Sequence, residues 1–363
     1  MVSTREPNGS NWRHGQATSR GTRAFEARFK QGVFGDLEGL AASSIGWSTS
    51  RRDGADSVHS MHCVVRNGVN VFDLVPYCRN GGAEKALAEA LSPSDDAPAV
   101  AREEIIVMSR AGFLDEDVGD FGPHTQLIED RYISRGTFAW EDLAQGNHTI
   151  APAFLRRAIE TSVRRLRTGI DVLFVASPAI QLSIVDLPTL EDRLRRAFET
   201  LEECVSERII GRYGVVNPAG LQLARLMELA REVGGNSHHF RAVQFPLSLH
   251  ATTLGVPREQ VVHGHAMNIL DAARELGLWV CVSGAIRRGD AEYDMDPEVR
   301  GRLGVLVTDA QLALQWARSM PGVGVALCGM RRLAHIEENC AVAAVPLADA
   351  ESVLAFLPDE AAS

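Results

Sequence analysis

Lysine is almost absent from this chain. Only two of its 37 basic residues are lysines, Lys30 and Lys85, and the formal net charge is −10. Nucleic acids and anionic membrane surfaces attract concentrated positive charge, and the sequence has no marked run of basic residues. It therefore disfavours both as partners. It also leaves few positions from which a lysine can take part in catalysis.

Long hydrophobic runs are also missing. No apolar stretch reaches the roughly 18 residues that a membrane-spanning helix needs. Residues 1–35 are polar and rich in arginine, serine and glycine, without the apolar core of a secretory signal. We expect these residues to form an N-terminal arm and the protein to be cytoplasmic.

The cysteines and histidines lack the spacing of metal sites. The six cysteines contain no CxxC pair, so we expect buried free thiols. The pairs His59/His62 and His263/His265 have no evident third ligand. The sequence thus predicts no metal site.

Short apolar runs rich in β-branched residues alternate with amphipathic segments. Eight of these runs are predicted to be strands: Ser44–Trp47, Val69–Val75, Ile105–Arg110, Ile170–Ala176, Arg212–Asn217, Ala242–Leu247, Leu278–Ser283 and Val323–Cys328. Continuous apolar strands are typical of parallel sheets that are covered on both faces. Between strands, Leu155, Ile159 and Val163 recur with the period of one helix face.

This alternation predicts an α/β protein with a single (β/α)8 TIM barrel over residues 36–358. The alternative, an open doubly wound sheet, would be expected to carry GxGxxG after its first strand, and no such motif is present. The longest irregular stretch, Phe113–Ile150, follows the third strand. In a barrel it would lie at the face where active sites form, as a long loop able to act as a lid.

Several segments resemble one family in order and spacing, from about residue 37 to 345. They are Val71–Cys78 with Gly81–Leu87, Asp171–Pro178 with Gln181-Leu182, Tyr213–Asn217, Val243–Leu247, and Gln311–Arg318 with Gly329–Asn339. Together they resemble the aldo-keto reductases. The resemblance implies a (β/α)8 barrel that transfers hydride from NADPH to an aldehyde or ketone.

In that family an aspartate, a tyrosine, a lysine and a histidine serve the reaction. Asp73 matches the aspartate, and a gapless count puts Cys78 at the tyrosine position, with Tyr77 one residue earlier. Arg110 stands at the lysine position and Ala176 at the histidine position. The resemblance therefore implies a degenerate catalytic tetrad.

These replacements change the expected chemistry. Arg110 stays charged at any working pH, so it is a fixed cation rather than a tuned proton shuttle. The Cys78 thiolate becomes a nucleophile or base if Arg110 lowers its pKa. His148, in the long loop, is the candidate for a substitute acid or base. We therefore expect ordinary carbonyl reduction to be lost or severely slowed.

The cofactor-binding positions match the family pattern more closely than the catalytic positions do. The resemblance assigns Asn217 and Gln244 to the nicotinamide carboxamide and Ser283 to the pyrophosphate. It assigns the 2′-phosphate to Arg331 or Arg332 and the adenine to Glu338 and Asn339, and Arg287 is a further candidate for cofactor binding. NADP(H) is thus the candidate cofactor. The serine and aromatic neighbours usual in the family are Val216 and Val282 here, so the alternative is a pocket that holds only part of the dinucleotide or a different anion.

Three hypotheses for function follow. The first is an enzyme that acts on a small carbonyl metabolite, in bacterial specialised metabolism, by cyclisation, dehydration or isomerisation. The second is an NADPH-dependent reductase of an activated substrate. The third is a non-catalytic binding or regulatory subunit. The sequence favours the first, with a small-molecule substrate, and does not indicate an oligomeric state.

Overall fold

The computed structural model describes residues 15–49, 58–92, 100–115, 125–249, 258–286, 297–304, 306–330 and 333–356. Eight parallel strands close into a barrel in the order β11-β12-β3-β4-β5-β6-β7-β8. Their bounds are β3 Ile45–Ser48, β4 Val71–Asp73, β5 Ile106–Ala111, β6 Ile170–Ala176, β7 Ile210–Val216, β8 Phe240–Pro246, β11 Trp279–Ser283 and β12 Val323–Cys328. The predicted (β/α)8 barrel is confirmed.

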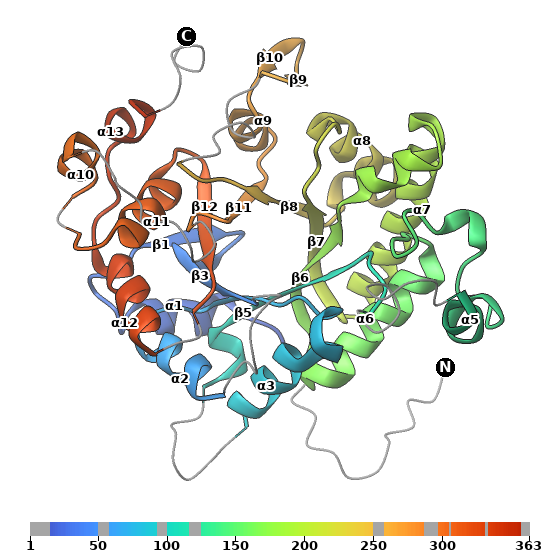
Figure 1. Cartoon of the computed structure of the whole chain (residues 1–363), viewed down its shortest axis with the longest axis horizontal. Coiled ribbons are helices and arrows are strands. Elements are labelled where there is room, and N and C mark those ends of the chain that lie inside the picture. Colours follow the sequence, from blue (N-terminus) through green and yellow to red (C-terminus); the bar gives the residue numbers. More distant parts are fainter. Residues whose placement is uncertain are drawn as a thin grey trace.

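A helix follows each barrel strand, and these helices form the outer ring (Figure 1). They are α2 Val58–Arg66, α3 Gly82–Ala90, α6 Pro152–Leu166, α7 Leu187–Ser206, α8 Leu223–Gly234, α9 Ile269–Glu275, α11 Asp309–Ser319 and α12 Leu333–Ala341. Three short helices lie among or after them, α5 Thr125–Ile128, α10 Pro297–Leu303 and α13 Ala350–Leu354. No described helix is both long and apolar enough to cross a membrane.

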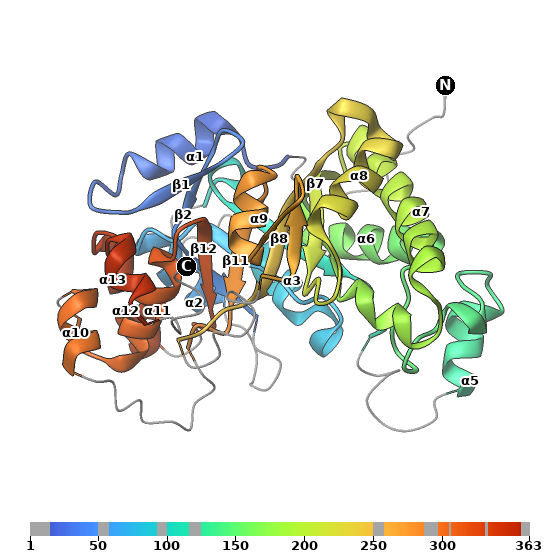
Figure 2. The same cartoon turned by 90° about the horizontal axis from the view of Figure 1, so that it is seen from above.

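Residues 19–43 form a helix and a hairpin before the first barrel strand. Helix α1 (Ser19–Glu26) begins at Thr18, whose side chain accepts a hydrogen bond from the Gly21 amide, and its Phe25 is fully buried. A hairpin follows, made of β1 (Phe34–Leu37) and β2 (Leu40–Ser43). Figure 2 shows α1 and the hairpin together across one end of the barrel. Residues 15–35 therefore help to close that end, and the boundary at residue 35 stays a prediction.

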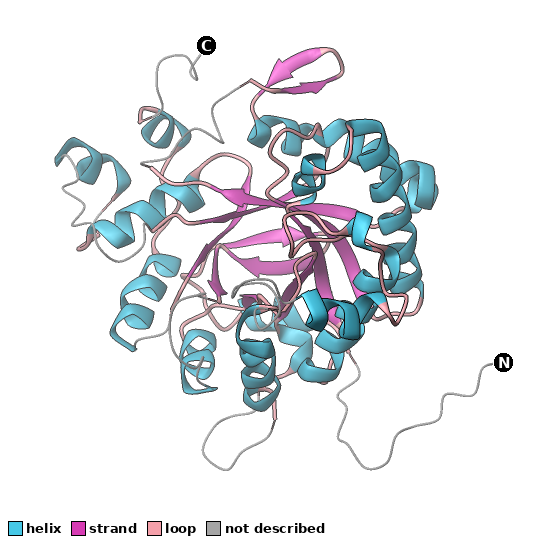
Figure 3. Cartoon of the chain, turned by 45° about the vertical axis from the view of Figure 1, so that its right-hand side comes forward, coloured by secondary structure: helices cyan, strands magenta, loops and turns pink. Residues whose placement is uncertain are grey.

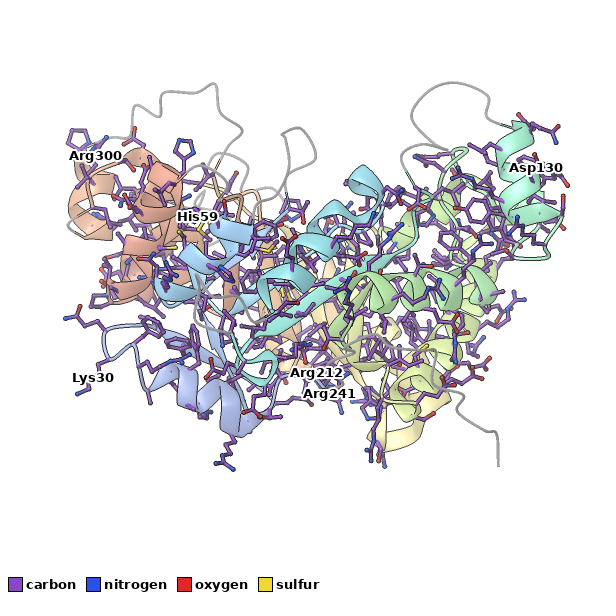
Figure 4. All side chains as sticks on the ribbon, turned by 90° about the horizontal axis from the view of Figure 1, so that it is seen from below. Lys30, His59, Asp130, Arg212, Arg241 and Arg300 are labelled. Carbon is purple, nitrogen blue, oxygen red and sulfur yellow. The ribbon has the colours of Figure 1, made fainter. Side chains whose placement is uncertain are left out.

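Ion pairs fasten the hairpin to the barrel. Glu38, at its turn, pairs with Arg212 of β7 and Arg241 of β8. Figure 4 shows these two arginines together at one end of the molecule, away from Asp130 at the other. The closed end is the one from which the strands start, so the site must form at the opposite end.

Two apolar layers hold the barrel together. Inside it, Val71, Met108, Phe174 and Leu327 belong to one buried cluster. A larger cluster lies between the sheet and the helices, and Figure 3 shows the strands enclosed by helices. A second hairpin, β9 (Gln260–Val262) with β10 (His265–Met267), lies outside the barrel.

The long loop is only partly irregular. After the third barrel strand it forms α5, a π-helical turn over Glu129–Ile133 and a 3-10 turn over Trp140–Asp142. Its Tyr132 and Phe138 stack at 5.3 Å and both contact Phe154 of α6. This aromatic cluster anchors part of the long loop to the barrel.

Strands β7 and β8 lie so close together at Gly214 that a substitution there tests the packing of the barrel. A Cβ atom there would lie 2.0 Å from the backbone oxygen of Ala242 on the neighbouring strand. Gly214→Ala should therefore lower the free energy of unfolding by about 3 kcal/mol or more, the upper range for overpacking. Gly301→Ala is the matched control, because nothing lies within 4 Å of its Cβ position on α10. Urea denaturation measures both, and equal midpoints would contradict this close contact.

Candidate active site

The carboxyl ends of four strands bring polar side chains together inside the barrel mouth. Arg110 of β5 forms an ion pair with Asp73 of β4 through Nη2. The same Nη2 donates to Oε1 of Gln244 on β8 at 3.3 Å, and Gln244 Nε2 donates to Asp73 at 3.4 Å. Ser48 of β3 donates to the second carboxylate oxygen of Asp73 at 2.8 Å. The structure thus unites three predicted residues and adds Ser48.

This cluster is largely buried. The side chain of Asp73 is 1% exposed and that of Arg110 is 10% exposed. Burial is the largest single effect and opposes the charged form of Arg110, but the charge of Asp73 and its hydrogen bond to Arg110, with further contributions from Tyr77 and Cys281, together outweigh it, so the pKa of Arg110 is raised. A buried ion pair keeps its place because removing either partner strands a charge. Nε of Arg110 is buried and has no hydrogen-bond partner among the described residues.

Tyr77 and Cys78 follow β4 and have different surroundings. Cys78 begins a 3-10 turn (Cys78–Gly81) and is only 2% exposed. Tyr77 is half-buried and lines a cleft of about 360 Å³ together with Arg110. Tyr77 is near enough to Arg110 to contribute to the raised pKa of that residue. Of the two side chains, Tyr77 is therefore the one open to a ligand beside Arg110.

Aromatic contacts fix Tyr77. Its ring lies 5.3 Å from that of Phe113, and Phe113 in turn meets the edge of His148 at 4.9 Å. A gapless count along the sequence does not decide between Tyr77 and Cys78, because the chain leaves the strand after Asp73. Beyond that residue, side chains no longer alternate as they do on a strand. The turn, rather than strand alternation, decides which side chain faces the mouth.

His148 lies next to the position where the family has its histidine. Its Nε2 bonds the backbone oxygen of Ala176 at 2.8 Å, and Gln181 donates to its Nδ1 at 3.0 Å. The residue is fully buried, and burial lowers the pKa of His148 to about 4. Both ring nitrogens are occupied and the ring is neutral at ordinary pH. This placement suits a brace between the loop and β6 rather than the predicted substitute acid.

The cofactor positions divide into two groups. Asn217 follows β7 with a left-handed φ of 55°. Its backbone N–H donates a hydrogen bond to the backbone oxygen of Gln244 at 2.7 Å. Ser283 ends β11, the neighbour of β8. These three residues share the barrel mouth.

The other positions belong to the far end of the expected cofactor. Glu338 and Asn339 lie on α12, where Glu338 accepts a hydrogen bond from Thr308 at the start of α11. Arg287, Arg331 and Arg332 lie outside the described residues. The structure therefore describes the nicotinamide end of the predicted site more fully than the phosphate end.

The described residues contain no group of three or more histidine, cysteine or acidic side chains that could hold a metal ion. His62 bonds the backbone oxygen of Ala90 at 2.8 Å. His263 lies 4.0 Å from Glu275 on the surface. The histidine pairs that the sequence raised are thus engaged elsewhere.

The neutral state of His148 predicts a pH dependence of stability. Its pKa is near 4 when folded and near 6.5 when unfolded, so its contribution is complete above pH 6.5 and is lost as the pH falls toward 4. The loss should approach roughly 3 kcal/mol, at about 1.4 kcal/mol per pKa unit. Unfolding free energies at several pH values should show that His148→Gln removes this slope. His263→Gln, a surface control, should keep it, and identical slopes in all three proteins would contradict the assignment.

Comparison with known proteins supports this reading of the barrel. The model of the aldo/keto reductase family matches residues 39–245. The fold is similar to an aldo/keto reductase from Klebsiella pneumoniae in complex with NADP and acetate, with 21% identity, a TM-score of 0.59, and coverage of 90% of this chain and 94% of that one.

Two further structures are also similar. They are the holo form of an aldo-keto reductase from Bacillus halodurans (17% identity, TM-score 0.59, covering 88% and 94%) and the glycerol dehydrogenase of Gluconobacter oxydans (18%, 0.58, covering 90% and 93%). No curated protein matches the sequence. Because the family model spans more than half of the chain, and the closed barrel carries Asp73 and Gln244 at its mouth, this protein belongs to the aldo/keto reductase family.

Proposed function

We propose that this protein is an NADP(H)-dependent reductase of an aldehyde or ketone in which Tyr77 donates the proton and the Asp73–Arg110 pair supports it. The observation that carries the proposal is the cleft shared by Tyr77 and Arg110 at the strand ends. Family membership makes the reaction class the expected one. The structure from Klebsiella pneumoniae that resembles this fold contains NADP.

The residues at the mouth fit the nicotinamide end of this cofactor. Asn217 follows β7 and Gln244 lies on the neighbouring strand β8. A side-chain amide of this kind offers the donor and acceptor that a carboxamide needs. Ser283 is the next polar side chain on the same edge. When bound, NADPH supplies the hydride, and the chain supplies the polar groups that orient it.

Tyr77 is the proposed donor of the proton to the carbonyl oxygen. As a carbonyl carbon accepts hydride, its oxygen gains negative charge and needs a proton. The hydroxyl of Tyr77 provides that proton, and the guanidinium of Arg110 stabilises the phenolate that remains. Asp73, held by Ser48 and Gln244, keeps Arg110 in position.

This proposal reverses the order of the earlier hypotheses. Non-redox chemistry was expected because the tyrosine, lysine and histidine of the tetrad were all judged to be replaced, and the cleft shared by Tyr77 and Arg110 supports Tyr77 as a proton donor instead. Cys78 is buried, so it does not enter the proposed reaction. Ala176 still provides no imidazole to orient the carbonyl. We therefore expect activated carbonyls to be the better substrates, as the second hypothesis states.

Substitution of the two neighbouring residues separates these mechanisms. Tyr77→Phe should lower kcat by about 10² to 10⁴-fold, the usual contribution of a general acid. Cys78→Ser should stay within about threefold of the unchanged protein, because a buried side chain does not meet the substrate. NADPH consumption at 340 nm with a panel of aldehydes and ketones measures both.

Arg110→Met tests the support of the phenolate. It should lower kcat and also change the pH profile, since the charge that stabilises the phenolate is lost. Activity that survives Tyr77→Phe but not Cys78→Ser would instead favour thiol chemistry. Failure of NADP(H) to bind in calorimetry would refute the proposed function.

A further inference from the structure

The cleft beside Tyr77 is lined by an unusual number of arginines. We call it the arginine cleft; its described basic lining is Arg110, Arg131, Arg135, Arg157 and Arg165, with Asp115 as the acidic residue. It lies between the ends of β4 and β5, helix α6 and the turn after α5. The cleft therefore connects Tyr77 and Arg110 of the proposed reaction site with Arg131 and Arg135 of the segment after α5.

Two of these arginines are held by carboxylates. Arg110 pairs with Asp73. Arg165 lies 3.5 Å from Glu84, a residue fully buried behind β5, and donates to Asn80 at 2.7 Å and to the backbone oxygen of Pro76 at 3.3 Å. These contacts fix the wall of the cleft nearest the barrel.

Two others are held without a carboxylate. Arg157 donates to the backbone oxygen of Arg131 at 2.9 Å, and its guanidinium lies 5.3 Å over the ring of Tyr132. Arg135 donates to the backbone oxygen of Asp130 at 3.1 Å. Neither has an acidic partner among the described residues. Their side chains are positioned, but their charge is not neutralised by these contacts.

Positioned guanidinium groups in a concave site favour an oxyanion. A guanidinium offers planar donors that match a carboxylate or phosphate. Several cations on one concave surface repel one another. A bound anion therefore lowers the free energy of this site more than it would lower that of an open surface. The volume of about 360 Å³ also leaves room for an organic molecule attached to the anion.

We infer that the arginine cleft binds a negatively charged group, a carboxylate or a phosphate, on the substrate whose carbonyl lies beside Tyr77. This inference rests on the proposed function for the carbonyl. It adds a substrate class, namely oxoacids or phosphorylated carbonyl compounds. Arg157 and Arg135 are the specificity residues, and Arg165, fixed by Glu84, forms the floor between them and the reaction site.

Matched substrate pairs test it. The full-length protein with NADPH is given benzaldehyde or 4-carboxybenzaldehyde in one arm, and glyceraldehyde or glyceraldehyde 3-phosphate in the other. In at least one arm the charged member should have a kcat/KM at least tenfold higher. A larger charged-to-neutral ratio of kcat/KM in the first arm indicates a site for a carboxylate, and a larger ratio in the second arm indicates a site for a phosphate. Ratios near one in both arms overturn the inference.

Variants locate the effect. Arg157→Gln and Arg135→Gln should each reduce the charged-to-neutral ratio by about tenfold, as expected for loss of a hydrogen bond to a charged group. Arg157→Lys should recover part of it. The control is Arg164→Gln, an exposed arginine on the same helix outside the cleft lining, and it should keep the ratio. Equal ratios in Arg157→Gln, Arg135→Gln and the unchanged protein contradict the inference.

A direct binding experiment separates this inference from the proposed function. If no aldehyde is reduced, calorimetry with benzoate and with inorganic phosphate still reports on the cleft. Binding of either that is weakened in Arg157→Gln and kept in Arg164→Gln supports the anion site even when the reductase proposal fails. Absence of binding by both anions overturns the site.

Discussion

The buried pair of Asp73 and Arg110 is the constraint on which the site depends. Two charges inside the mouth of an apolar barrel are costly to desolvate. Their ion pair offsets this cost, so the loss of either residue would leave an uncompensated buried charge. Ser48 and Gln244 complete the hydrogen bonds of the carboxylate. Four strands are thereby tied at one point, and any group that approaches Arg110 meets a cation whose position is already fixed.

An arginine in this place gives the site a different character from a lysine. Its charge does not respond to pH, and its planar group reaches both Asp73 and Gln244 through one nitrogen. It can stabilise negative charge on a neighbouring oxygen but cannot relay a proton. The proposed proton therefore comes from Tyr77 itself. Arg110 contributes its positive charge and takes no part in proton transfer.

The long segment after β5 has two structural roles. His148, bonded to Ala176 and Gln181, braces its end against β6. The cluster of Tyr132, Phe138 and Phe154 attaches its middle to α6. These contacts carry arginines to the edge of the mouth, so a segment that has no barrel strand of its own supplies the wall of the cleft.

The sequence alone determined the barrel, because eight apolar runs alternating with amphipathic helices have few other ways to bury both faces of a parallel sheet. It also predicted Asp73, Arg110 and Gln244 as site residues, and these lie on regular strands, where spacing is a reliable guide. Tyr77 and Cys78 lie in a turn, where spacing loses that meaning, and only the tertiary structure decided which of them is buried. The engagement of His148 and the gathering of distant arginines likewise depend on contacts across the fold that no local pattern encodes.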